Sequence, residues 1–190
     1  MMFLFMESKT QPISGTAKVE NALSSDISHT SFETEEKGGW AYYGNPVSSI
    51  NAKTGSNYYD LGTGSISKSG IGANTTNKFL LTFWVRRSSG KGNWIFLGQT
   101  EILDTAWKLV VREVTTNAVE ITGSGIYLDE LRLYPSNAQM TTYTYDSMGD
   151  MKTITDSRNY TVYYDYDAFR RLRTIKDDNG QIKEHYEYNF

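Results

Sequence analysis

Tyrosine pairs recur at a near-constant step along the C-terminal part of this 190-residue chain. Tyr145, Tyr166 and Tyr188 lie 21 and 22 residues apart, and each has another tyrosine two positions before it. Such a step indicates an internal repeat in which every copy is one small supersecondary unit. Eight of the 14 tyrosines follow Met140, where proline and tryptophan are absent. The last part of the chain is therefore a module distinct from the rest.

Each copy of the repeat predicts a strand, a turn and a second strand. The two copies read "YTYDSMGDMKTITD" and "YDYDAFRRLRTIKDDNG", and "HYEYNF" opens a third. "DDNG" is a strong hairpin turn because Asn-Gly readily takes positive φ, whereas the parallel "DSRN" is a weaker one. Alternation puts both tyrosines of a pair on one strand face, where rings of neighbouring copies can pack as cross-strand pairs.

The whole chain favours an all-β fold. Its alternating runs are short and end in Gly, Asn or Ser, and no stretch of a dozen residues keeps a helical period. "KFLLTFWVRR" is the clearest strand, with Phe79, Leu81, Phe83 and Val85 on one face. We expect a flexible leader over 1–25, a β-sandwich over 26–135, a linker over 136–141 and repeat hairpins over 142–190.

Charge and residue usage exclude several classes of protein. The net charge of −3, from 19 basic and 22 acidic residues, argues against a strongly basic nucleic-acid binder and gives no attraction to a membrane surface. No apolar run approaches the roughly 20 residues of a membrane helix, so we expect no membrane insertion. The chain has no cysteine and hence no disulfide or thiolate metal site. No signal sequence is visible in it.

The C-terminal module resembles the YD repeats of bacterial RHS-type proteins. The two copies quoted above carry the resemblance, although Arg170 stands where the family has glycine and Asn159 replaces the turn glycine. The resemblance implies a bacterial cell-surface or secreted protein, in which many such hairpins wind into a hollow β-shell. Two copies cannot enclose anything. The last strand should have an unpaired edge, so we expect the tail to fold back or to self-associate through its YD strands.

The front part resembles the jelly-roll sandwich of carbohydrate-binding and galactose-binding-like modules. "SFETEEKGGW", "FLLTFWVRR" and "SGIYLDELRLYP" carry this resemblance. It implies a jelly-roll β-sandwich with affinity for carbohydrate and one structural calcium ion between the first and last strands. The fold class that we predict is thus all-β, a jelly-roll sandwich followed by YD-repeat hairpins.

Asp129 is the candidate for holding that calcium ion. In "YLDELRL" it shares a strand face with Leu131 and Leu133, whereas Glu130 lies on the solvent face. A buried carboxylate needs a cation or several N–H donors. Calcium accepts carboxylate and carbonyl oxygens, and the resemblance implies Glu33 as the partner ligand. The alternative is that Asp129 is a strand-end carboxylate bonded to loop amides.

Trp84 is the leading candidate for ligand contact. It alternates with Thr82 and Arg86 on the less apolar face of its strand. An aromatic ring on a sheet face can stack on a sugar while polar neighbours supply hydrogen bonds. We predict a ligand surface made of Trp84, Arg86, Tyr43 and Tyr59. The alternative is that these aromatic rings are core or rim packing residues.

These observations predict a non-catalytic binding or structural module of an RHS-type protein. A spacer or assembly module without sugar affinity is the alternative. A glycan-processing enzyme is the least favoured reading, because it would need two facing carboxylates roughly 5–9.5 Å apart in a cleft. Asp165 and Asp167 match the D-x-D motif of nucleotide-sugar transferases superficially, but the repeat already explains them.

Overall fold

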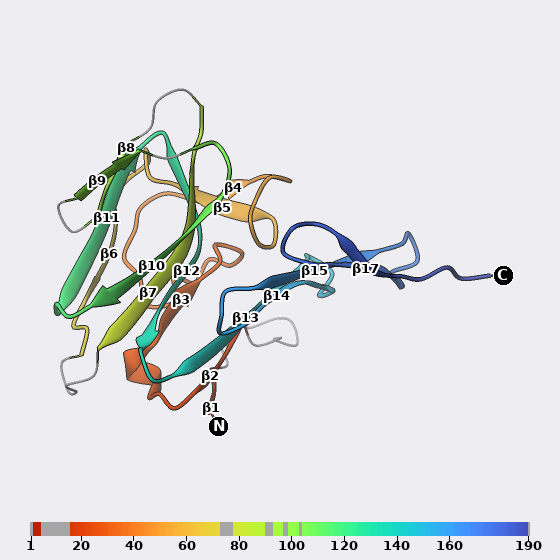
Figure 1. Ribbon diagram of the computed structural model, residues 1–190, viewed down its shortest axis with the longest axis horizontal. Helices are drawn as coiled ribbons and strands as arrows, with labels where there is room; N and C mark the ends of the chain where they lie inside the picture. The colour runs from red at the N-terminus through yellow and green to blue at the C-terminus, as the bar shows by residue number, and fades with distance from the viewer. Residues whose placement is uncertain are drawn as a thin grey trace. The chain divides into compact units, whose positions relative to one another are not determined.

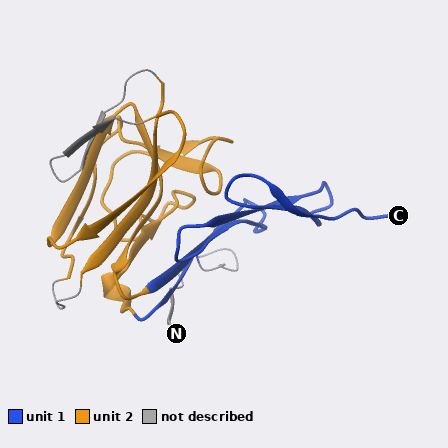
Figure 2. Cartoon of the chain, in the orientation of Figure 1, with its two compact units in different colours: residues 1–21, 139–190 blue, residues 22–138 orange. Residues whose placement is uncertain are grey.

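The structure, a computed structural model, describes residues 2–4, 16–72, 78–89, 93–96, 99–102 and 104–189 (Figure 1). These residues form an all-β protein with antiparallel strand pairing, and their one helical element is the short 3₁₀ turn η1 (Ser24–Asp26). The chain divides into two compact units (Figure 2). We call Ala22–Ala138 the sandwich unit, and Met1–Asn21 with Gln139–Phe190 the hairpin unit.

The sandwich unit contains two sheets (Figure 1). The first has the order β10 (Lys108–Val114), β7 (Phe79–Arg87), β12 (Ile126–Pro135), β5 (Asn57–Asp60) and β4 (Val47–Ser48), and β3 (Ser28–Thr30) also pairs with β12. The second has the order β6 (Ile66–Ser69), β11 (Ala118–Ser124), β8 (Asn93–Phe96) and β9 (Gln99–Ile102).

Side chains from both sheets share one core. The predicted apolar face of β7 points into it, and Leu81, Phe83 and Val85 have no exposed surface. Ile66 of β6 and Ile121 of β11 belong to the same buried cluster. The burial of one face of each sheet against the other confirms the sandwich-like, all-β character. The jelly-roll topology stays a prediction.

A β-bulge interrupts the alternation of β12. The pairing of β12 with β7 shifts register between Asp129 and Arg132, and Glu130 has a φ of 52°. Leu128 faces the core before the bulge and Leu131 faces it afterwards, three positions later instead of two or four. An extra residue of this kind reverses the face of every side chain that follows it.

The bulge corrects the predicted position of Asp129. It does not share a face with Leu131 and Leu133, because it pairs with Trp84, which lies on the outer face of the sheet. Asp129 is nevertheless fully buried, as predicted. Glu130, which the sequence placed on the solvent face, is only 2% exposed. Simple alternation fails here because it assumes a regular strand.

The hairpin unit is one antiparallel sheet. Its strands are β1 (Met2–Leu4), β2 (Ala17–Glu20), β13 (Gln139–Tyr145), β14 (Met151–Thr155), β15 (Thr161–Tyr166), β16 (Leu172–Lys176) and β17 (Ile182–His185), in that order across the sheet. β2 lies within the span expected to be a flexible leader, and β13 begins within the expected linker. The two strands pair with each other, so this span is ordered where the structure describes it.

Equivalent tyrosines occupy equivalent places in the two copies of the repeat. Tyr145 pairs with Met151, and Tyr166 pairs with Leu172, each directly after a register shift. This equivalence was expected from the 21-residue alignment of the sequence. It shows that the repeat is a repeat of strand pairing, whichever family the chain comes from.

Four turns of the hairpin unit share one hydrogen-bonding pattern, in which an aspartate carboxylate organises the turn. Its Oδ1 accepts N–H groups from the residues two and four positions later, at 2.8–3.0 Å. The residue three positions later has a positive φ. The aspartates are Asp146, Asp156, Asp167 and Asp177, and the positive-φ residues are Gly149, Asn159, Arg170 and Gly180. The Asp of Tyr145-Asp146 and the Asp of Tyr166-Asp167 therefore each start a turn.

Arg170 occupies a left-handed position where glycine was expected. Its guanidinium donates from Nε to Asp150 Oδ2 at 2.7 Å and from Nη2 to Asp150 Oδ1 at 2.8 Å. Nη2 also donates to the Met148 carbonyl at 2.9 Å. Both partners lie in the equivalent turn of the preceding copy. Planar bidentate pairing of this kind is strong and directional, so the side chain offsets backbone strain.

The turn glycines give a direct test of this pattern. A Cβ at Gly180 would meet nothing within 4 Å, so alanine there adds only the strain of a positive φ of 77°. We expect Gly180→Ala to lower the free energy of unfolding by about 1–2 kcal/mol. Asn159→Gly, at the same position of another turn, should leave it unchanged or raise it. Urea denaturation measures both, and equal stability of Gly180→Ala and the parent chain would contradict the pattern.

Candidate functional site

The outer face of the first sheet carries three aromatic rings around one arginine. The Arg86 guanidinium carbon lies 5.8 Å from the Tyr58 ring centroid, 5.3 Å from that of Tyr127 and 5.0 Å from that of Trp107. Arg86 lies on β7, Tyr58 on β5 and Tyr127 on β12, and Trp107 directly precedes β10. We call these four residues the aromatic face. Attraction between the cation and the ring faces holds them together.

Neighbouring contacts fix the rings of the aromatic face. Tyr58 and Tyr127 lie with their centroids 4.4 Å apart, and Tyr58 meets Trp107 edge-on at 6.2 Å. Trp107 donates its indole N–H to the Asn51 carbonyl at 2.9 Å. Tyr58 is only 6% exposed, and burial raises the pKa of its hydroxyl. Trp107 and Tyr127 are half-exposed, so these rings and Arg86 are the parts that a ligand can reach.

Sequence reasoning missed Tyr127 and Trp107 as site residues. Tyr127 alternates with the core residue Leu128, and this parity would have placed it on the outer face with Arg86, with which it pairs. Trp107 lies outside any strand, so alternation carries no information about its direction. Its position depends on a carbonyl 56 residues away in the sequence, which no local pattern shows.

Trp84, the leading candidate from the sequence, lies on the same outer face as Arg86 and is half-buried. The Lys53 ammonium lies over its ring, 4.0 Å from the centroid. Its indole nitrogen is buried without a hydrogen-bond acceptor among the described residues. Part of the ring surface that could stack on a sugar is therefore already covered by Lys53.

Tyr59 and Tyr43 lie apart from the aromatic face. Tyr59 has no exposed surface and packs in the core against Phe32 and Tyr42, with centroids 5.7 and 5.1 Å away. A fully buried ring cannot stack on a ligand, which corrects its predicted role. Tyr43 is 81% exposed and accepts the Tyr59 hydroxyl through its carbonyl at 2.8 Å. No described contact joins its ring to Arg86.

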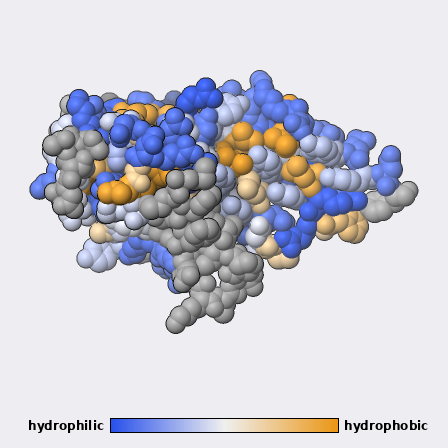
Figure 3. All heavy atoms as spheres, turned by 90° about the horizontal axis from the view of Figure 1, so that it is seen from below, coloured by the Kyte–Doolittle hydropathy of each residue, from blue (hydrophilic) through white to orange (hydrophobic). Residues whose placement is uncertain are grey.

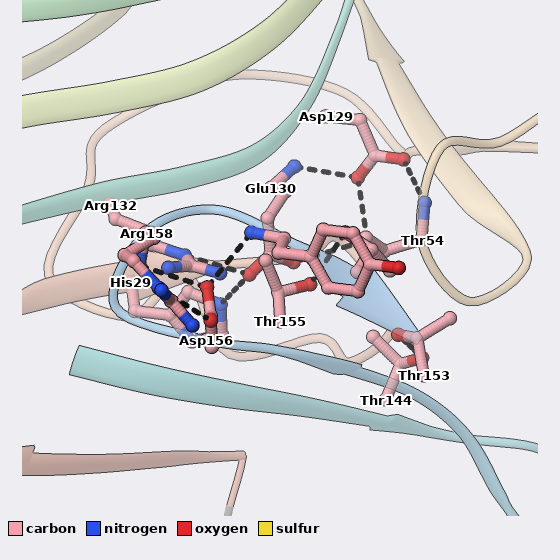
Figure 4. Close-up of polar contacts among 12 residues, drawn as sticks. His29, Thr54, Asp129, Glu130, Arg132, Thr144, Thr153, Thr155, Asp156 and Arg158 are labelled. Atoms are coloured by element: carbon pink, nitrogen blue, oxygen red, sulfur yellow. Dashed lines mark hydrogen bonds and ion pairs between the residues drawn. The ribbon is translucent and has the colours of Figure 1, made fainter. Parts of the chain in front are cut away.

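Asp129 binds the loop between β4 and β5 (Figure 4). Its Oδ2 accepts the N–H groups of Lys53 at 2.8 Å and Thr54 at 2.9 Å. Its Oδ1 accepts the Glu130 N–H at 2.6 Å and the Thr54 hydroxyl at 3.3 Å. These donors match the alternative reading of the sequence, a strand-end carboxylate bonded to loop amides.

Glu33 binds the far end of the same loop. Its Oε1 accepts the N–H groups of Ser56 at 2.8 Å and Asn57 at 2.7 Å. Gly55 has a φ of 58°, and a Cβ there would lie 2.4 Å from the Glu33 carboxyl group. The approach of carboxylate and backbone therefore requires glycine. Asp129 and Glu33 together hold both halves of residues 53–57.

Glu130 anchors a buried charged group beside Asp129 (Figure 4). Its Oε1 accepts from Arg132 Nε at 3.0 Å and lies 3.5 Å from His29 Nε2, and its Oε2 accepts the Thr54 hydroxyl at 3.1 Å. Arg132 is fully buried. A buried ion pair needs this kind of dense hydrogen bonding to offset the loss of solvation.

The electrostatics of the loop bear on the calcium prediction. Burial raises the pKa of Asp129 well above its usual range, and the charges of Glu130 and Glu33 raise it further, while the Thr54 N–H opposes them. A cation would relieve this repulsion. However, no group of three or more His, Cys, Asp or Glu side chains in the described part of the chain is placed to hold a metal. The loop amides account for the burial of Asp129, and a calcium ion at Glu33 and Asp129 stays a prediction.

Thermal unfolding tests the calcium prediction. We expect calcium to raise the melting temperature and a chelator to lower it, because a ligand bound only by the native state adds stability. Asp129→Ala should abolish the shift. Glu33→Gln keeps an acceptor for the loop amides but loses the charge, so it should weaken the shift without unfolding the loop. The exposed Glu35→Gln is the matched control. A melting temperature indifferent to both calcium and chelator would exclude the ion.

No protein-family model matches this chain, and no curated protein matches it. The two resemblances therefore rest on the residues quoted for them. In the part of the chain that the structure describes, no helix has the length and apolar character needed to cross a membrane.

Proposed function

We propose that the sandwich unit is a non-catalytic carbohydrate-binding module whose ligand lies against the aromatic face. The observation that carries this proposal is the pair of half-exposed rings, Trp107 and Tyr127, held in fixed positions around Arg86. A sugar presents an apolar C–H face that packs on an aromatic ring, and its hydroxyl groups bond to the polar groups beside that ring. Fixed rings also lose little conformational freedom on binding.

The carboxylates beside the aromatic face support binding rather than catalysis. In strand register Asp60 pairs with Tyr127, and Asp129 pairs with Trp84. Asp60 accepts the Gly62 N–H at 2.8 Å, and Asp129 accepts loop amides. Carboxylates that organise the backbone are poorly suited to act as general acids and bases. We place the module in a bacterial cell-surface or secreted protein of the RHS type, on the strength of the repeated Tyr-Asp hairpins.

Titration with soluble polysaccharides tests the proposed function, with tryptophan fluorescence as the readout. We expect saturable binding, and about tenfold weaker binding by Trp107→Ala, which corresponds to about 1.4 kcal/mol. Tyr160→Ala, a 41% exposed tyrosine of the hairpin unit, is the control and should bind as the parent chain does. Trp84→Ala and Tyr43→Ala in the same titration decide whether either ring also contributes. A Trp107→Ala variant with full affinity would contradict the proposal.

A role in assembly is the second candidate, and the free edge of β17 favours it. Among the described strands, β17 pairs only with β16, and all four of its residues are exposed. Ile182 is 61% exposed on this strand. On the face that Figure 3 displays, apolar side chains lie in small patches separated by polar ones. An open strand edge is a template for pairing with another chain.

Light scattering over a range of concentrations tests self-association through this edge. We expect the apparent mass to rise with concentration, and Ile182→Lys to reduce that rise because a charge on an edge strand opposes pairing. Leu23→Lys, which removes a 67% exposed leucine of the sandwich unit, is the control. A constant monomer mass at all concentrations would leave only the binding role.

A further inference from the structure

We propose that the carbohydrate bound at the aromatic face is acidic, and that Arg86 pairs with the carboxylate of a uronic acid residue. This inference rests on the proposed function and adds the class of ligand. It follows from what surrounds the guanidinium, from which of its donors lack acceptors, and from the charges beside it.

Arg86 is held by rings rather than by a counter-ion. Its guanidinium carbon lies over the faces of three rings, and no described residue accepts a hydrogen bond from its N–H donors. No described carboxylate lies within the 4.0 Å of an ion pair. The next residue differs, because Arg87 Nη2 lies 4.0 Å from Asp104 Oδ1. Among the described residues, Arg86 therefore lacks the carboxylate partner that arginine usually has.

Three buried polar atoms on the outer side of β7 have no hydrogen-bond partner among the described residues. They are Oγ1 of Thr82, the indole nitrogen of Trp84 and Nε of Arg86, at alternate positions of the strand. A buried donor without an acceptor costs free energy. Because Nε is buried, a ligand carboxylate would meet the guanidinium end-on and accept from Nη1 and Nη2 together, in the bidentate geometry that arginine favours. It would thus supply acceptors for two terminal N–H groups that bond to no described residue.

The charges around Arg86 agree with an anionic ligand. Lys53 adds a second cation to the same face, over the Trp84 ring. The facing carboxylates are Asp60, whose Oδ1 is used by the Gly62 N–H, and Asp129, which is buried beneath the loop that carries Lys53. A neutral sugar would offer the guanidinium only hydroxyl groups. A uronate would use the rings and the unpaired guanidinium edge together, with the selectivity of a charged pair.

The experiment compares acidic polysaccharides with their own methyl esters, which remove the charge and keep the sugar backbone. Polygalacturonate and alginate oligomers, each free and fully esterified, are titrated into the full-length chain by calorimetry. We expect at least one free acid to bind tenfold or more tightly than its ester, with a preference that shrinks as salt is added. Arg86→Gln should bring the affinity for the acid down to that for the ester, both measured with the same variant.

Matched variants separate the two proposals. Arg86→Lys keeps the positive charge but loses the paired N–H donors of the guanidinium, so it should lose part of the preference for the acid over the ester. Arg87→Gln on the same strand should keep all of that preference. Circular dichroism and melting temperature establish that each variant is folded. Equal affinity for acids and esters, or an acid preference that survives in Arg86→Gln, overturns the acidic ligand and leaves the carbohydrate-binding role intact. Binding of neither form, nor of any neutral polysaccharide tested beside them, overturns both.

Discussion

The hydrogen bonds from residues 53–57 to two carboxylates determine the outer face of the sandwich. Asp129 binds the middle of the loop between β4 and β5, and Glu33 binds its end at β5. The same loop supplies the Asn51 carbonyl that orients Trp107, and the Lys53 ammonium that covers Trp84. The orientation of Trp107, and the covering of Trp84, thus depend on a loop that two carboxylates hold in place. Loss of either carboxylate would disturb rings that it never touches.

The hairpin unit is organised by a different and more local interaction. One aspartate oxygen accepts two backbone N–H groups in each of the four turns, and a left-handed residue completes each turn. This explains why Asp follows Tyr in the repeat, and why Asp156 and Asp177 recur halfway between. Arg170 shows how a residue with a Cβ replaces glycine, since its bidentate pair with Asp150 links successive turns.

Sequence reasoning succeeded where periodicity is local and regular. The inward face of β7 and the equivalence of Tyr145 with Tyr166 were accessible from alternation and repeat spacing. It failed at the bulge of β12, because one extra residue in positive φ leaves no clear mark in "YLDEL". It also missed the pairing of β2 with β13. That contact joins segments more than a hundred residues apart, and its short strand lies in a polar, aperiodic span.

The prediction of the site residues also failed where it needed the pairing of strands. Tyr58 and Tyr59 are adjacent and chemically alike, yet one belongs to the aromatic face and the other to the core. Only the parity of the strand against its neighbours separates them. The ligand class inferred for Arg86 depends in turn on the lack of a counter-ion among the residues that the structure describes, which is a property of the three-dimensional arrangement. Composition records how many charges a chain has, and not which of them remain unpaired.

The local nature of the aspartate turns has a consequence for how such a chain can change in length. Every bond that defines a turn joins residues at most four positions apart, so a copied segment brings its complete turn with it. Gene duplication can therefore lengthen or shorten the hairpin sheet by whole copies that carry their own turns. The sandwich unit cannot be lengthened in this way, because Asp129 bonds to backbone amides 75 and 76 residues away in the sequence. The hairpin unit can therefore change in length by the gain or loss of whole copies, whereas the sandwich unit cannot.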